Sequence, residues 1–155
     1  MIKIYKLIVA IIFSYISLNS YILAETIGYA DFKKIESNYA FAQKAYKEID
    51  EKVLGLQQYL IDKDKEYKAI ESPLSKKNFE QKVEKEYKAK EEALLKLKTQ
   101  KEEEVFNNIQ SASKIVSAQK KIDVVFDYRV ILSGGTDITQ DIIDYLNSNQ
   151  KSVKK

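Results

Sequence analysis

The 155-residue chain contains no cysteine and no histidine, and it has only one proline. No disulfide can therefore hold it together. Without thiols and imidazoles it also lacks a strong nucleophile, the general base that titrates near neutral pH and the usual zinc ligands. These absences disfavour an enzyme, and we expect no catalytic residues, no metal site and no cofactor.

The first residues have the layout of a secretory signal peptide. Two lysines precede residues 7–18, which are apolar except for two serines, and Ala24 offers a small residue for cleavage. The alternative is an uncleaved membrane anchor, but the apolar segment is short for a bilayer span and is interrupted by Asn19 and Ser20. We expect residues 1–24 to be removed and the remaining chain to be exported.

Lysines and acidic residues are interleaved along the rest of the chain. Removing residues 1–24 takes two of the 26 basic residues and none of the 23 acidic ones, so the net charge falls from +3 to about +1. Interleaved charge is typical of solvated helix faces, whereas nucleic-acid binding needs a basic stripe. We expect no nucleic-acid partner.

The single proline, Pro73, lies between two long segments that are rich in lysine and glutamate and have apolar residues at helical spacing. In the first segment the spacing alternates between four and three residues, which predicts a helix that packs along a partner. The positions on this seam are Ile35, Tyr39, Ala42, Tyr46, Ile49, Val53, Leu56, Leu60, Lys63, Tyr67, Ile70 and Leu74. The second segment, roughly residues 75–120, has a spacing of about 3.7 residues and predicts a straighter helix.

Two such helices, joined at residues 72–75, predict a long antiparallel hairpin over residues 35–116 with its tip near residues 71–76. We expect the first helix to begin at residues 31–34 and to end at about Glu71, because the residue before Pro73 is pushed out of helical geometry. Alternatively, Pro73 lies in the first turn of the second helix with Ser72 as its cap. At ~1.5 Å per residue the helices would be roughly 60 and 70 Å long, too long for this chain to enclose. The hairpin has to project.

Residues 25–34 and 117–150 predict a small association domain of strands and one helix, and residues 151–155 form a basic tail. Strands are expected at residues 25–31, 122–127 and 130–132, and a last helix from Gln140 to about Asn147. So small a sheet lacks a sufficient core, and without disulfides or metal the remaining source of stability is self-association. The residues predicted at the interface between subunits are Ile27, Tyr29, Ile122, Val124, Phe126, Val130 and Leu132, with residues 122, 124 and 126 expected on one face.

Two segments carry a likeness to a known family: Ile27-Gly28-Tyr29-Ala30-Asp31, and Ile122-Asp123-Val124-Val125-Phe126-Asp127 through Asp137-Ile138-Thr139. In this order, around a long hairpin and behind a signal peptide, they resemble the Skp/OmpH family of periplasmic chaperones over essentially the whole mature chain. The resemblance implies an α+β fold and a jellyfish-shaped homotrimer, whose hairpins hang as tentacles around a cavity. It also implies an ATP-independent holdase in the periplasm that binds unfolded outer-membrane proteins before their insertion.

The nearly neutral mature chain departs from the family, whose members are often strongly basic. Contact with lipopolysaccharide or anionic lipid therefore stays open, and no residues are assigned to it. An alternative function is that of an envelope coiled-coil structural or adaptor protein with one defined partner. The helical seam fits this alternative equally well, but a coiled-coil spacer would not need the strands that flank the hairpin.

Aromatic residues gather around the expected distal half of the hairpin. Tyr67 and Phe79 are interpreted first as packing between the two helices, and Tyr59, Tyr67, Phe79 and Tyr87 are candidates for contact with client chains, because aromatic rings present apolar area at little entropic cost. Tyr59 falls off the predicted seam and is the better candidate. Lys63 lies on the seam, where we expect its stem to pack and its ammonium to reach water, or else a local loosening that lets the hairpin bend.

Overall fold

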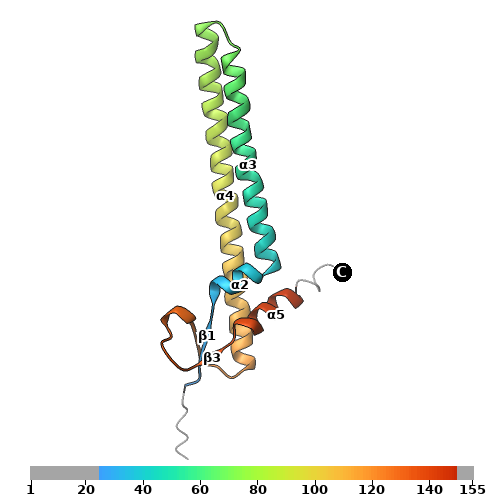
Figure 1. Cartoon of the computed structure of the whole chain (residues 1–155), viewed down its shortest axis with the longest axis vertical. Coiled ribbons are helices and arrows are strands. Elements are labelled where there is room, and N and C mark those ends of the chain that lie inside the picture. Colours follow the sequence, from blue (N-terminus) through green and yellow to red (C-terminus); the bar gives the residue numbers. More distant parts are fainter. Residues whose placement is uncertain (1–24, 150–155) are drawn as a thin grey trace, which may run out of the picture.

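The computed structural model describes residues 25–149, in which two long helices project from a small region that contains a short sheet (Figure 1). Residues 1–24, with the expected signal peptide, and residues 150–155, with the basic tail, lie outside the described part. In chain order the elements are β1 (Ile27–Ala30), α2 (Phe32–Asn38), α3 (Ala40–Lys68), α4 (Pro73–Gln119), β2 (Val124–Asp127), the 3₁₀ helix η1 (Tyr128–Val130), β3 (Thr136–Asp137) and α5 (Thr139–Asn149). The predicted α+β class with long helices is confirmed.

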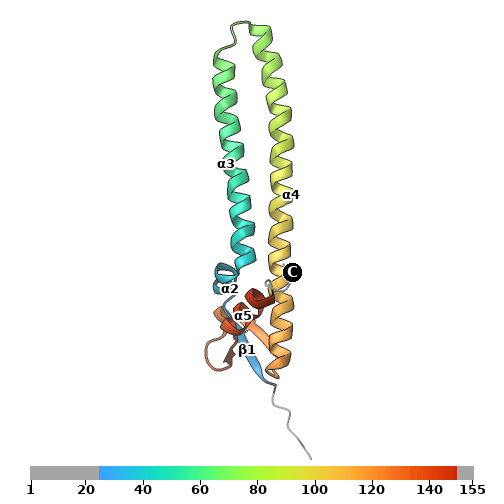
Figure 2. The ribbon, with the colours of Figure 1, turned by 90° about the vertical axis from the view of Figure 1, so that its right-hand side faces the viewer.

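The helices α3 and α4 lie side by side and run in opposite directions in both views (Figures 1 and 2). We call residues 46–101 the arm, and residues 25–45 together with 102–149 the head. At the far end of the arm, Ser72 caps α4 by accepting a hydrogen bond from Ser75 N, and Pro73 occupies the first turn. This is the second of the two placements predicted for the proline.

The first helix is broken at Tyr39, which has an extended backbone (φ −87°, ψ 112°) and separates α2 from α3. Asn147 on α5 holds the break, because its side chain accepts a hydrogen bond from Ala40 N (3.0 Å) and donates one to Asn38 O (2.9 Å). The two contacts satisfy backbone groups that a helix end leaves without partners. The prediction of one unbroken helix is therefore wrong, since a residue 107 positions away supplies these partners.

The sheet has three parallel strands in the order β2-β1-β3. The predicted strand at residues 130–132 is wrong, because the chain enters η1 directly after β2 and the third strand is β3. The side chain of Asp127 accepts a hydrogen bond from Arg129 N (2.9 Å), which favours a tight turn over a continued strand. Parallel strands need a long connection, and the whole arm lies within the connection from β1 to β2.

The core of the head lies where β1, α2, the lower part of α4 and α5 meet. Ile35, Ile138 and Ile142 are each at most 1% exposed. The core continues into α3 and α4 beyond the boundaries predicted at residues 34 and 117. Gly28 lies directly against Ile122, and a Cβ at this position would be 2.9 Å from Ile122 Cγ2, so the close approach requires glycine.

The two segments singled out in the sequence contact each other in the head. Ile138 N donates to Tyr29 O (3.0 Å), and Asp31 N donates to Oγ1 of the buried Thr139 (2.9 Å). Asp31 also caps the N-terminus of α2, while the Asp137 side chain accepts a hydrogen bond from Thr139 N (2.9 Å). The Asp-Ile-Thr sequence therefore joins the start of α5 to the end of β1.

Candidate interaction surfaces on the head and the arm

One face of the small sheet is apolar, and no element among residues 25–149 covers it. Ile27, Val124 and Phe126 are 43%, 39% and 43% exposed, and Tyr29 beside them is half-buried. The register pairs Ile27 with Val124 and Tyr29 with Phe126, so the four side chains share one face, which we call the open sheet face. Parallel sheets are normally covered on both faces, and the described residues supply a layer on only one of them.

The segment after β2, residues 128–132, displays further apolar side chains, and we call it the apolar loop. Val130 and Leu132 are 69% and 101% exposed. The start of the loop is fixed, because Arg129 donates from Nε and Nη2 to the two carboxylate oxygens of Asp127, at 2.8 Å each. The same hydrogen bonds lower the pKa of Asp127 to about 2. The apolar side chains are thus presented from a turn that is held in place.

Ile122 is the predicted interface residue that the structure contradicts. It is 6% exposed and packs against Gly28 inside the chain. Lys121 has a left-handed backbone (φ 57°) and turns the chain between α4 and β2, so the alternation of the strand begins only at Val124. The other six predicted residues belong to the open sheet face and the apolar loop. Their role between subunits stays a prediction.

The arm has almost no interior. Between Ile49 and Val105 no side chain is buried, although residues 50–104 make up most of the two long helices. The seam between α3 and α4 contains tyrosine, phenylalanine, leucine, valine and lysine side chains that are only partly covered. Burial of apolar surface, which contributes roughly 25 cal/mol per Å², therefore adds little to the pairing of the helices here.

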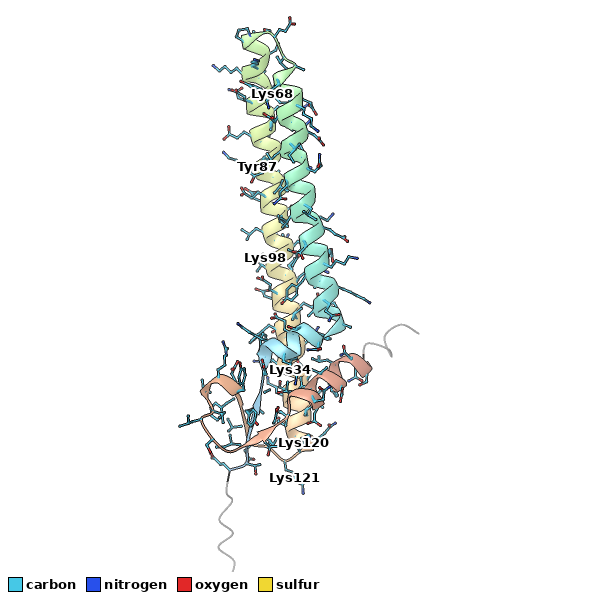
Figure 3. All side chains as sticks on the ribbon, in the orientation of Figure 1. Lys34, Lys68, Tyr87, Lys98, Lys120 and Lys121 are labelled. Atoms are coloured by element: carbon cyan, nitrogen blue, oxygen red, sulfur yellow. The ribbon has the colours of Figure 1, made fainter. Side chains whose placement is uncertain are left out.

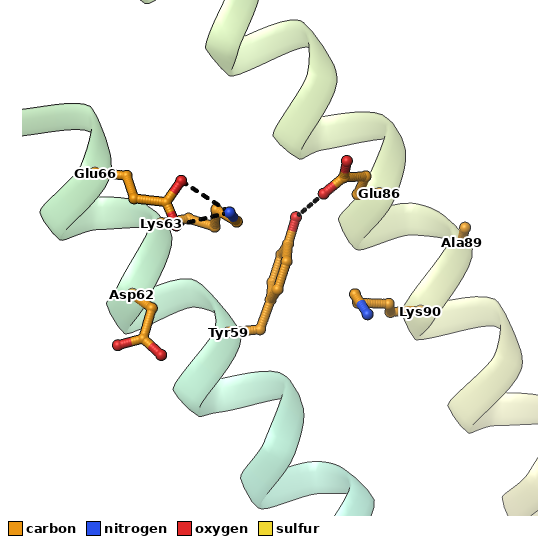
Figure 4. A pocket seen from close by; sticks show the side chains of 7 residues that line it. All are labelled: Tyr59, Asp62, Lys63, Glu66, Glu86, Ala89 and Lys90. Atoms are coloured by element: carbon orange, nitrogen blue, oxygen red, sulfur yellow. Dashed lines mark hydrogen bonds and ion pairs between the residues drawn. The ribbon is translucent and has the colours of Figure 1, made fainter. Parts of the chain in front are cut away.

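Tyr59 lies in the middle of this seam, between Lys63 and Lys90 (Figure 4). Its hydroxyl donates to Glu86 Oε2 (2.7 Å), which links α3 to α4. The Nζ atoms of Lys63 and Lys90 are 5.6 and 5.0 Å from the ring centroid, which is cation–π geometry. Lys63 also pairs with Glu66 (2.8 Å), and its side chain is 25% exposed, so most of the side chain packs, as predicted for its stem. Partial burial, followed by the hydrogen bond to Glu86, raises the pKa of Tyr59 to about 12.

Nearer the tip, Tyr67 on α3 and Phe79 on α4 face each other with ring centroids 6.3 Å apart. Lys76 Nζ lies 5.2 Å from the centroid of Tyr67, and Lys63 Nζ lies 5.9 Å from that of Phe79. A cation–π contact at an exposed site contributes about 0.5–1 kcal/mol. The distal seam is therefore held by several weak, directional contacts.

The prediction that Tyr59 lies off the seam is wrong. Its long side chain reaches a carboxylate on α4, whereas Leu60, which was assigned to the seam, is 42% exposed. Tyr67 and Phe79 pack between the two helices, as the first interpretation of them held. Tyr87 is half-buried and lines a groove with both of them. Contact of these four aromatic residues with clients stays a prediction.

Three exposed apolar residues on the arm were not predicted from the sequence. Leu54, Ile61 and Leu95 are 63%, 52% and 64% exposed, and we call them the outer arm residues. Leu54 and Ile61 are seven residues apart and therefore lie on the same side of α3. A search for apolar residues that recur every seven positions outside the seam would have found these two.

Charged side chains project along the whole arm, among them Lys68 and Lys98 (Figure 3). Many pair within one helix, as Lys68 does with Asp64 (2.6 Å) and Lys88 with Glu84 (2.7 Å). Exposed pairs of this kind contribute little to stability, at roughly 0–1 kcal/mol each. Their effect is to surround the outer arm residues with a solvated surface.

The described part of the chain contains no group of three or more acidic side chains placed to hold a metal ion. Among residues 25–149, no helix has both the length and the apolar character that a membrane span requires. The geometry defines an α+β protein with a projecting two-helix arm and an uncovered sheet. No protein-family model matches the chain, and a search of curated proteins found no match.

Proposed function

We propose that this protein is an ATP-independent holdase chaperone of the Skp/OmpH type, which binds unfolded outer-membrane proteins in the periplasm and prevents their aggregation before insertion. In this proposal three copies associate through their heads, and their arms act as hairpin tentacles around a cavity. The main support for the proposal comes from the arm. Residues 50–104 bury no side chain, and the outer arm residues are exposed away from the seam. A structural rod would hide such residues, whereas a surface for unfolded chains displays them.

The head supports the self-association. The open sheet face and the apolar loop leave large apolar side chains in water, and the chain has no cysteine that could stabilise a small sheet by disulfides. Covering the missing layer with further copies removes this cost. The same association sets several arms beside one another.

Weak contacts from several arms can retain a client that no single contact would hold. Burying one leucine side chain contributes about 1.5–3 kcal/mol at most, so an individual contact breaks quickly. Contacts from linked arms raise the effective concentration of each next site, and retention grows by avidity. Release then needs no nucleotide, because folding into a membrane removes the apolar surface of the client.

The test is dilution of a denatured porin into buffer with purified residues 25–155, followed by light scattering without nucleotide. We expect suppression of aggregation at near-stoichiometric amounts. A triple variant with Leu54→Gln, Ile61→Gln and Leu95→Gln should lose most of it, and the matched control with methionine at the same positions should retain it. All three side chains are exposed, so neither variant disturbs a core.

Two outcomes would contradict the proposal. One is equal protection by the glutamine and methionine variants, which would remove the arm surface from client binding. The other is absence of protection together with binding to one folded envelope protein, which would favour an adaptor. Solution mass and a scattering profile of residues 25–155 test the oligomer separately, and a compact monomer would refute it.

A further inference from the structure

We infer that the apolar loop of one copy docks into an apolar groove on the head of the next copy, in a head-to-tail contact. The loop would insert Val130 and Leu132. This inference rests on the self-association in the proposed function and names the surfaces that would produce it.

The groove lies between α2, α4 and β2 and has a volume of about 440 Å³. Phe32, Phe106, Val125 and Phe126 form much of its lining. The rings of Phe32 and Phe106 are tilted against each other with centroids 6.0 Å apart, and Phe106 is 51% exposed. Exposed aromatic side chains around a concave apolar surface are typical of a site for apolar anchors.

The charges of the groove fit an uncharged occupant. Its charged lining residues are Asp127 and Arg129, which neutralise each other through their ion pair. Residues 130–136 contain no charged side chain. A partner segment of this composition enters the groove without leaving a buried charge unpaired.

The apolar side chains of the loop do not fill the groove of their own chain. Leu132 is fully exposed and follows Arg129, a lining residue of the groove, by only three positions. The loop projects beside β1 (dark orange in Figure 1). Gly134 and Gly135 have positive φ values of 81° and 87°, and a Cβ at Gly135 would lie 3.3 Å from Ile27 O. The loop is thus returned to the sheet in a set conformation, which lowers the entropic cost of docking.

A loop that enters a different surface on the next copy makes a heterologous contact, and repetition of such a contact closes a ring when the rotation permits. Phe126 lines the groove and also belongs to the open sheet face, so the two surfaces meet at β2. Docking of the loop therefore brings a second chain against the uncovered layer of the sheet. One contact would satisfy the loop, the groove and the sheet of every copy.

The chain lacks cysteine, so introduced cysteines give an unambiguous test in the protein of residues 25–155. Leu132→Cys marks the loop, and Ser113→Cys marks the groove that Ser113 lines. Oxidation of a mixture of the two single variants should give a disulfide-linked dimer, and each variant alone should give little. The double variant should give a ladder that stops at the ring size. Leu132→Cys mixed with Gln58→Cys on the arm is the matched control.

Three results would overturn the inference. Leu132→Cys that links to itself as well as to Ser113→Cys would show a contact between identical surfaces. Linking no stronger than the arm control, in a protein that is oligomeric by mass, would show that something else occupies the groove, such as a client or residues 150–155. A monomeric mass in solution would refute the self-association itself. The chaperone activity is tested separately by the aggregation assay, so its failure can be told apart from these three results.

A second pair of variants removes the dependence on disulfide chemistry. Leu132→Asp should weaken self-association by about ten-fold or more, as loss of a central apolar anchor does. The matched control Ser133→Asp adds the same charge to the neighbouring exposed residue and should have a small effect. Leu132 is fully exposed in the described part of the chain, so its replacement does not unfold the head. Equal mass distributions for both variants would contradict the docking.

Discussion

Replacing Asn147 with alanine tests whether α5 holds the break between α2 and α3. The change removes the acceptor for Ala40 N and the donor to Asn38 O. Loss of a capping acceptor typically costs about 1 kcal/mol, and loss of a further net hydrogen bond costs about 0.5–1.5 kcal/mol. Because the second bond is exposed, we expect a total near the lower end, about 1.5 kcal/mol in the free energy of unfolding.

The assay is urea unfolding of residues 25–155 by far-UV circular dichroism at one fixed protein concentration, together with hydrogen exchange at the Ala40 amide. Asn147→Asp is the matched control, since it keeps the acceptor for Ala40 N and loses the donor to Asn38 O. It should destabilise less than Asn147→Ala and leave the Ala40 amide better protected. If Asn147→Ala changes neither the unfolding midpoint nor the exchange at Ala40, the break is not maintained by α5.

Three further predictions concern the head and the seam. Gly28→Ala should destabilise by about 1–3 kcal/mol in urea unfolding, because the new methyl group overlaps the buried Ile122, and a neutral result would contradict the close approach. Ile138→Ala in the head should lower the free energy of unfolding by about 2–5 kcal/mol, whereas Leu56→Ala in the half-buried seam should lower it by about 1 kcal/mol or less. Equal losses would show that the arm has a core. The pKa of Asp127 falls from 3.8 in the unfolded chain to about 2 in the folded protein. Its contribution to stability is therefore present above about pH 4 and is lost as the pH falls toward 2. Arg129→Gln should flatten this pH dependence of the unfolding midpoint, and an unchanged profile would refute the role of the ion pair.

The sequence predicted the features that depend on local periodicity. The long helices, the proline that separates them and the first strand follow from spacing and turn chemistry that operate over a few residues. The break at Tyr39 could not be found in this way, because its partners come from Asn147 on another helix. The third strand was misplaced for a related reason: residues 130–132 have strand composition, but the side chain of Asp127 directs the chain into η1.

Prediction of the candidate surfaces succeeded or failed residue by residue. Alternation placed Val124 and Phe126 together on one face of the sheet, as the structure has them, but it included Ile122, because a left-handed Lys121 has no signal in the apolar pattern. The four-three rhythm assigned Leu60 to the seam and left Tyr59 off it. In the structure the hydroxyl of Tyr59 reaches α4, and a rule that scores apolar residues does not count this contact.

The distribution of buried side chains separates stability from binding in this molecule. The head contains all of the buried isoleucines of residues 25–149 except Ile49, so its fold does not depend on what the arm contacts. In the arm, the Tyr59 hydroxyl and the lysines over aromatic rings fix the register of α3 and α4 by directional contacts. The half-buried leucines, valine and aromatic residues between the helices add partial apolar burial to these contacts. The outer arm residues lie outside this pairing and stay exposed. In the proposed function they contact clients, so their replacement should change client binding more than the stability of the fold.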